Sequence, residues 1–129
     1  MKAICRLVLV AGAATLLSSC SPPEIQMVVT GVGGRLRVTL VQDWGFIFSR
    51  KQTPCVREAG LYPSGAKARH SAVWLIEAQG KVQCLDLASF TVGNTPNGFK
   101  QVVPLSGVRN QTYSLEVRGI GWGETEIRL

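Results

Sequence analysis

Alternating apolar and polar residues predict the first two strands of the chain. Ile25, Met27 and Val29 share one face of an extended segment, and the run 36–40 repeats this period of two. Each run therefore has one face suited to a core and one suited to water. The glycine-rich segment 30–34 between them favours a turn. We expect the two runs to pair as a hairpin.

The pattern then becomes less regular. Aromatic residues alternate with other residues over 44–49, which predicts a third strand that continues the second after a bend at 42–43. The segment 50–70 has no clear period and mixes charges with proline and glycine. We expect an irregular connection there, with one helical turn around 56–60.

The second half of the chain again predicts strands. The run 73–76 is apolar on both sides, as in a strand buried in a sheet, and a tight turn at 78–81 leads into 82–87 as a second hairpin. The apolar segment 99–105 is interrupted by Pro104, which is typical of a strand end or a sheet edge.

The clearest alternation comes last, over 113–118 and 124–129, with a glycine-rich turn at 119–123 that makes a third hairpin. Short strands, frequent Gly and Pro turns and the lack of a helical period after residue 19 indicate an all-β fold. We predict a small antiparallel β-sandwich of about seven strands.

The segment 108–118, Val-Arg-Asn-Gln-Thr-Tyr-Ser-Leu-Glu-Val-Arg, resembles the loop and penultimate strand of fibronectin type III and immunoglobulin-like domains. The resemblance covers roughly 71–129. It implies that Tyr113 is a corner tyrosine that hydrogen-bonds to the backbone and serves stability. The tryptophan of the second strand is displaced to Trp44 in this sequence, and 50–70 is an insertion.

The N-terminus has the three parts of a secretory signal: a basic start with Lys2 and Arg6, an apolar stretch over 7–17, and small residues. The apolar stretch is too short to span a bilayer. Its end, Leu-Ser-Ser-Cys at 17–20, resembles the lipobox of bacterial lipoproteins. The resemblance implies that residues 1–19 are removed and that Cys20 receives a diacylglycerol and further acyl chains such as palmitate.

Three expectations about location and boundaries follow from this resemblance. The protein is exported and lipid-anchored, and because Ser21 replaces the aspartate that retains lipoproteins at the inner membrane, the periplasmic face of the outer membrane is favoured in a Gram-negative host. Residues 20–23 form the lipidated cysteine and a short proline-rich tether. A single domain then occupies 24–129. The alternative is an ordinary secretory signal with an incidental cysteine.

Export also bears on the two remaining cysteines, Cys55 and Cys84. A bacterial periplasm is oxidising, so a disulfide is expected. A reactive or metal-binding thiol pair is the alternative, but the sequence has no CxxC spacing and no histidine cluster to support it.

Composition limits the remaining function classes. The 129 residues include fourteen Lys and Arg, eight Asp and Glu, and one His. Without Lys2 and Arg6 the balance is twelve against eight, a charge of +4, which is modest for a nucleic-acid binder. A single histidine leaves few soft ligands. We expect no metal, no cofactor and no nucleic-acid partner.

Catalysis has little support in the sequence. A triad could be written from His70, Ser64 or Ser71, and Asp43 or Asp86, but no Gly-x-Ser-x-Gly elbow presents a nucleophile. The carboxylates are scattered rather than paired. We predict that the protein is not an enzyme.

Binding is the remaining role. We expect a non-catalytic interaction or assembly module of the cell envelope that binds another envelope protein; Trp122 either packs on the sandwich, which we favour, or anchors a partner. The alternative is an acidic glycan or lipid held by the basic half, 35–69. Ser-Gly-Ala-Lys at 64–67 also resembles a loop of lysozyme inhibitors, which implies inhibition of an exogenous hydrolase. The candidate partner-binding residues are Arg35, Arg37, Lys67, Arg69 and Trp122.

Overall fold

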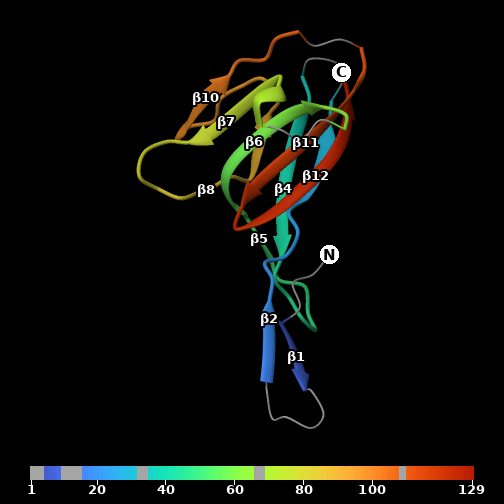
Figure 1. Cartoon of the computed structure of the whole chain (residues 1–129), viewed down its shortest axis with the longest axis vertical. Helices are drawn as coiled ribbons and strands as arrows, with labels where there is room; N and C mark the ends of the chain where they lie inside the picture. The colour runs from blue at the N-terminus through green and yellow to red at the C-terminus, as the bar shows by residue number, and fades with distance from the viewer. Residues whose placement is uncertain (1–4, 10–15, 32–34, 66–68, 108–109) are drawn as a thin grey trace.

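The computed structural model describes residues 5–9, 16–31, 35–65, 69–107 and 110–129, with side chains from Ser21 onward except that of Arg69. Its described part is all-β with no α-helix (Figure 1). Two antiparallel sheets form the sandwich from ten strands, β3 to β12, and seven of these have five or more residues. The all-β sandwich predicted from the sequence is confirmed.

The smaller sheet is built around β4. Its strand β3 pairs with β4 in the antiparallel register that sets Thr30 opposite Arg37, so the first predicted hairpin is confirmed; of its turn, residues 32–34 lie outside the described part. Strands β5 and β9 pair with different stretches of the other side of β4. The bounds are β3 (Gln26–Thr30), β4 (Arg37–Asp43), β5 (Lys51–Gln52) and β9 (Ser89–Thr91).

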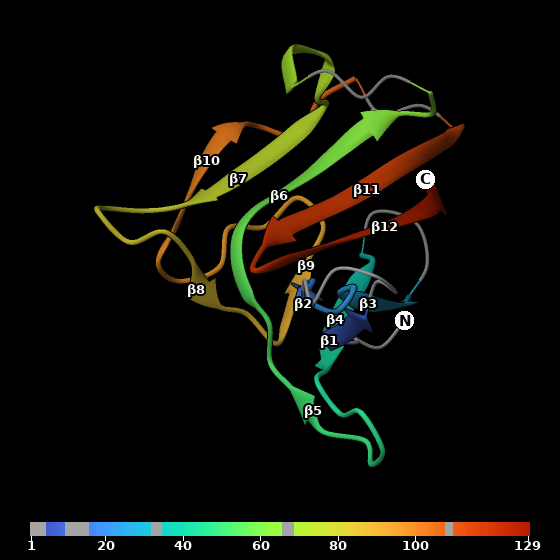
Figure 2. The same cartoon turned by 60° about the horizontal axis from the view of Figure 1, so that its bottom comes forward.

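The larger sheet has the order β10-β7-β6-β11-β12, and β8 pairs with the beginning of β6. Figure 2 shows this sheet as one layer, with β3, β4 and β9 in the second. The predicted hairpin at the end of the chain is β11–β12. The bounds are β6 (Cys55–Pro63), β7 (Trp74–Ala78), β8 (Leu85–Asp86), β10 (Phe99–Val103), β11 (Thr112–Gly119) and β12 (Gly121–Arg128), and a 3-10 turn, η1 (Arg69–Ser71), follows β6.

The expectation of an irregular connection with a helical turn over 50–70 is wrong. The middle of this segment, Cys55–Pro63, is β6, which lies between β7 and β11 in the large sheet. A strand with neighbours on both sides and side chains buried on both faces shows no simple alternation, which hid it in the sequence. Gly60 fits this place because a Cβ there would meet the ring of Tyr62 and the side chain of Leu75.

The predicted hairpin over 73–87 is also wrong in its pairing. Strand β7 pairs with β6 and β10, whereas β8 pairs with β6 at Cys55 and Val56. The expected disulfide explains this placement, because Cys55 and Cys84 are bonded, with 5.3 Å between their Cα atoms. The bond holds the chain before β8 against the start of β6 rather than against β7.

The core between the sheets contains Trp74 of β7, which is fully buried and stacks on Phe90 of β9 with 5.7 Å between ring centroids. Because β7 and β9 belong to different sheets, this pair joins the two layers. Tyr113 is buried on β11. The core tryptophan is thus Trp74, and Trp44 lies in a loop beyond β4.

The N-terminal segment forms a separate two-stranded hairpin, β1 (Cys5–Leu9) and β2 (Leu16–Cys20), which projects from one end of the sandwich (Figure 1). Ser21 and Pro22 are exposed, but Pro23 is already buried. The packed domain therefore begins at Pro23, one residue before the predicted boundary.

Candidate functional site

The segment after β4 is a closed loop, Trp44–Arg50, organised by the carboxylate of Asp43. Its Oδ1 accepts hydrogen bonds of 2.9 Å from the amides of Gly45 and Arg50, and its Oδ2 accepts one of 2.9 Å from the hydroxyl of Ser49. The amide of Trp44 donates to the carbonyl of Arg50 at 2.9 Å. One buried carboxylate thus joins the two ends of the loop.

These bonds correct the expectation of a strand over 44–49. An aspartate that accepts from nearby amides offers the backbone an alternative to strand pairing. Gly45 makes the tight path possible, because a Cβ there would overlap the carbonyl of Phe48. The alternating aromatic residues therefore follow a loop and do not face a core.

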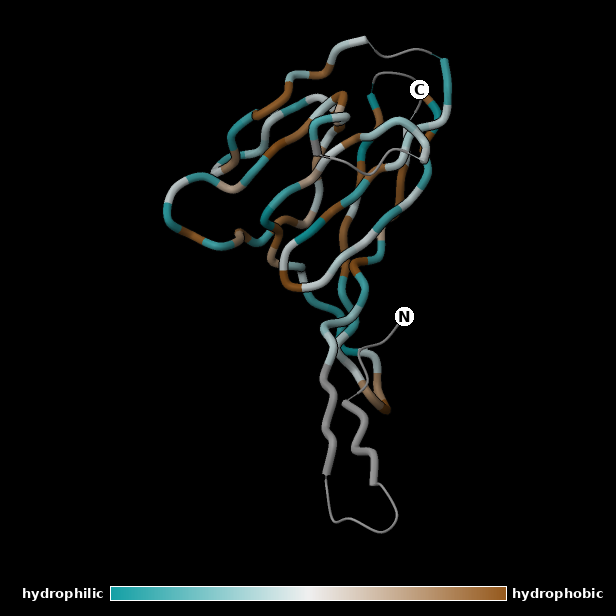
Figure 3. Tube along the Cα trace, viewed as in Figure 1, coloured by the Kyte–Doolittle hydropathy of each residue, from teal (hydrophilic) through white to brown (hydrophobic). Residues whose placement is uncertain are grey.

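The loop presents apolar side chains to solvent. Phe46, Ile47 and Phe48 are 69%, 75% and 82% exposed, and Trp44 at the neck is 37% exposed. In Figure 3 the tip of the segment between β4 and β5 has the colour of hydrophobic residues. Three consecutive exposed side chains of this size form a patch of the kind that marks an interaction site.

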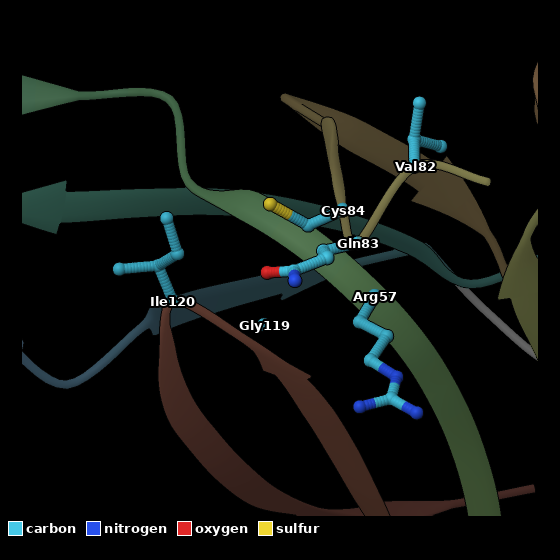
Figure 4. Close-up of a pocket in the computed structure, with 6 residues that line it drawn as sticks. All are labelled: Arg57, Val82, Gln83, Cys84, Gly119 and Ile120. Carbon is cyan, nitrogen blue, oxygen red and sulfur yellow. The ribbon is translucent and has the colours of Figure 1, made fainter.

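A second feature is a groove of about 450 Å³ where the disulfide meets the β11–β12 turn. Figure 4 shows Gln83 between Ile120 and Arg57, with Val82 further out. The amide of Ile120 donates to the carbonyl of Cys55 at 3.0 Å, which fixes the turn against β6. Val82 and Ile120 are each half-exposed, so the groove adds apolar surface.

Hydrogen bonds tie the loop, this turn and the start of the domain together. The side chain of Gln42, which is buried, donates from Nε2 to the carbonyl of Pro23 at 3.0 Å and to the carbonyl of Ile120. The amide of Ile25 donates to the carbonyl of Trp122 at 2.9 Å. We call this end of the sandwich the base: it comprises the segment 21–25, the Trp44–Arg50 loop and the turn 119–121.

The predicted basic half is divided between the two ends of the sandwich. Arg35 and Arg37 are exposed at the start of β4, and six residue steps, or roughly 20 Å, separate Arg37 from Asp43 at the base. Arg37 donates to the hydroxyl of Ser89 at 3.0 Å. Arg50, by contrast, is the last residue of the loop, and Lys51 follows it.

The other candidate residues are placed as follows. Arg69 lies in η1, beyond the end of β6 that is farther from the base, and its side chain is not described; Lys67 lies outside the described residues. Trp122 is on β12 rather than at the tip of its turn, and at 44% exposed it is partly covered by the domain and partly open to solvent. Cys20 ends β2, and its side chain is not among those described.

The residues considered for catalysis are not gathered into a site. His70 is exposed in η1, after the end of β6, whereas Asp43 is buried at the base and its carboxylate holds the loop. Asp86 is exposed on β8. Among the residues that the structure describes, no three His, Cys, Asp or Glu side chains cluster in a way that could hold a metal ion.

Comparisons with known proteins supply no relative: no protein family matches the chain, and no curated protein or solved structure is significantly similar to it. Within the described part of the chain, there is also no helix of sufficient length and apolar character to span a membrane.

The apolar loop tip was not among the residues singled out from the sequence. A usable signal was present, because an aspartate two residues before a glycine favours a local turn, and three large apolar residues follow before Arg50 and Lys51. Ile120 and Val82 carried no such signal, since only the folded chain brings the turn and the disulfide together.

Proposed function

We propose that the protein is a bacterial lipoprotein, anchored through acyl chains on Cys20, whose sandwich acts as a non-catalytic protein-interaction module of the cell envelope. The observation that carries the proposal is the Leu-Ser-Ser-Cys motif at 17–20, which follows an apolar stretch and immediately precedes the packed domain at Pro23. Two or more acyl chains hold a protein stably at a membrane.

The anchoring is tested by metabolic labelling with an alkyne analogue of palmitate, followed by mass spectrometry of the N-terminal peptide. We expect a peptide that starts at Cys20 and carries a diacylglycerol. Cys20→Ser abolishes the label, and Cys5→Ser, the matched control within the same N-terminal region, retains it. An unmodified N-terminus with residues 1–19 intact contradicts the proposal.

The interaction role is supported by Trp122. This side chain is 44% exposed on β12, the strand at one edge of the large sheet. The backbone carbonyl of Trp122 already accepts a hydrogen bond from Ile25, so the exposed indole is the part offered to a partner. Tryptophan is enriched among the residues that dominate binding energy. Val102, 40% exposed on β10 at the opposite edge, offers a matched comparison.

Crosslinking in cells, followed by purification of the lipidated protein, tests this role. We expect one dominant envelope protein, lost from the Trp122→Ala variant and retained by Val102→Ala. Equal capture by the two variants removes Trp122 from the proposal. Capture of no protein by the wild-type chain contradicts the interaction role itself.

A second candidate partner is an acidic glycan or lipid. Arg35 and Arg37 are two residues apart, so they extend from the same face of the chain leading into β4, and both are exposed at the end away from the base. With the base anchored, this end is directed away from the membrane. Retention on an acidic glycan that is lost with salt and in Arg35→Glu/Arg37→Glu, but kept in Lys100→Glu, supports this candidate.

A further inference from the structure

The three most exposed large apolar side chains of the described part of the chain, Phe46, Ile47 and Phe48, are consecutive and form the tip of one loop. Their total apolar surface is costly to leave in water, since each such side chain gains substantially on transfer to an apolar medium. Burial of this tip in an apolar medium is therefore favourable.

The loop is held in shape before any partner arrives. Asp43 binds both ends of it, and the close approach of Gly45 to the carbonyl of Phe48 fixes the turn between them. A preformed loop loses little conformational entropy on binding. The tip is therefore presented as a rigid wedge.

The loop also has the charge pattern of a membrane-binding element. Arg50 and Lys51, both exposed, follow the tip, and no acidic residue occurs between Trp44 and Arg57. Cations at this position are attracted to anionic headgroups. Trp44, exposed at the neck, is of the residue type that prefers the headgroup region.

Its place in the fold brings the loop to a bilayer. Gln42, one residue before Asp43, hydrogen-bonds to the carbonyl of Pro23, so the loop and the start of the domain lie at the same end. Three residue steps join Pro23 to Cys20, and they span at most about 11 Å. Acyl chains on Cys20 would hold the base within that distance of the headgroups.

From these observations we propose that the Trp44–Arg50 loop inserts its Phe46-Ile47-Phe48 tip into the bilayer, beside the acylated Cys20, and orients the sandwich with its base on the membrane. The occupant is the headgroup and upper acyl region of an anionic bilayer. The proposal rests on the lipid anchor proposed above for its geometry, but the loop can be tested apart from the anchor.

Fluorescent labels at single positions show which part of the protein enters the bilayer. Ile47→Cys is labelled with the environment-sensitive dye NBD in the lipidated protein, reconstituted in vesicles of phosphatidylethanolamine and phosphatidylglycerol, three to one. Val102→Cys on the edge strand β10 carries the same dye as the matched control. We expect a blue shift and quenching by spin-labelled lipids at position 47 and neither at position 102.

Two variants identify the parts of the loop. Phe46→Ser/Phe48→Ser should abolish most of the quenching at position 47, because two buried aromatic rings are lost and each is worth roughly tenfold or more in a partition constant. Arg50→Glu/Lys51→Glu should weaken insertion in anionic vesicles and leave neutral vesicles unaffected. Val28→Ser, at an exposed apolar position on β3, should change nothing.

Failure of the anchor and failure of the loop give different results. If Cys20 is unacylated, the anchor proposal fails, and the loop is then tested by adding vesicles to the labelled chain with Cys5→Ser/Cys20→Ser. A blue shift at position 47 sustains insertion, and its absence overturns it. Insertion is also overturned if the dye at position 47 shows no blue shift in the acylated, vesicle-bound protein. The same holds if the blue shift appears only after an envelope protein is added.

Discussion

Asp43 and Arg50 are seven residues apart in the chain, and their side-chain carboxylate and backbone amide are joined by a hydrogen bond of 2.9 Å. This bond closes the neck of the apolar loop. The same carboxylate also binds Gly45 and Ser49, so a single side chain determines that the segment leaves the sheet and returns to it at β5.

Removal of this carboxylate should open the loop. In Asp43→Ala the amides of Gly45 and Arg50 lose their acceptor, and we expect a loss of about 1–3 kcal/mol in the free energy of unfolding. Trypsin should then cleave faster after Arg50 and Lys51. Urea unfolding and timed proteolysis measure both effects.

Asp86→Ala is the control, because that carboxylate is exposed on β8, and its effect should stay within about 0.5 kcal/mol. Asp43→Asn should fall between the two, since an amide oxygen can replace one carboxylate oxygen as acceptor. Unchanged proteolysis of Asp43→Ala would falsify the account of the loop.

Gln42 gives a prediction about pH. Its buried amide donates to the carbonyls of Pro23 and Ile120, and an ionised carboxylate at this position has no proton to donate to either. In Gln42→Glu, burial and the two facing carbonyls disfavour the charged form and raise the pKa of the introduced carboxyl in the folded state. The variant should therefore be stable at low pH and lose stability as the pH rises through that pKa.

Urea unfolding at pH 5 and pH 8 measures this effect. The wild-type protein and Gln42→Leu, neither of which has a titrating group at this position, should show a smaller difference between the two pH values. If Gln42→Glu loses the same free energy of unfolding at pH 5 and at pH 8, the introduced carboxyl reaches solvent instead of facing the carbonyls.

The disulfide should supply a large part of the stability. Cys55 and Cys84 are 29 residues apart, and closing a loop of that length is worth roughly 3–4 kcal/mol on the chain-entropy account. Cys55→Ser/Cys84→Ser should lower the urea midpoint accordingly. Cys20→Ser, outside the packed domain, should leave the midpoint unchanged; a similar loss in both variants would be inconsistent with this assignment.

Trp74 should show a graded response to substitution. Trp74→Ala leaves a large cavity between the sheets and should cost about 3–5 kcal/mol. Trp74→Phe keeps an aromatic ring against Phe90 and removes an indole N–H that has no hydrogen-bond acceptor among the described residues, so its cost should stay below about 2 kcal/mol. If urea unfolding shows the same loss of free energy for Trp74→Ala and Trp74→Phe, this account of Trp74 is wrong.

Several elements of the fold could be predicted from short stretches of the sequence. The pairs β3–β4 and β11–β12 are antiparallel neighbours in the chain, with alternating side chains and glycine-containing turns, so period and turn chemistry predict them without reference to the rest of the molecule. The disulfide followed from the even pair of cysteines and the exported context. The lipobox resemblance of Cys20 is likewise a property of the sequence and remains a proposal.

The candidate site could not be predicted from the sequence alone. Residues 44–49 have the period of a strand, and only the bonds to Asp43 show that they form a loop with an apolar tip. Its proximity to Pro23 depends on Gln42, nineteen residues further along the chain, and the division of the basic residues depends on the direction of β4.

The sequence by itself thus determined the all-β class, the β3–β4 and β11–β12 hairpins and the disulfide. Strand period, turn residues and cysteine pairing act over short stretches or depend on composition. The tertiary structure decided that 55–63 is a central strand, that Trp74 is the core tryptophan and that the base gathers its loop, turn and tether. These features depend on contacts between distant segments of the chain. The free energy of such contacts outweighs the local preference of a segment, and the contacts leave no pattern in the local sequence.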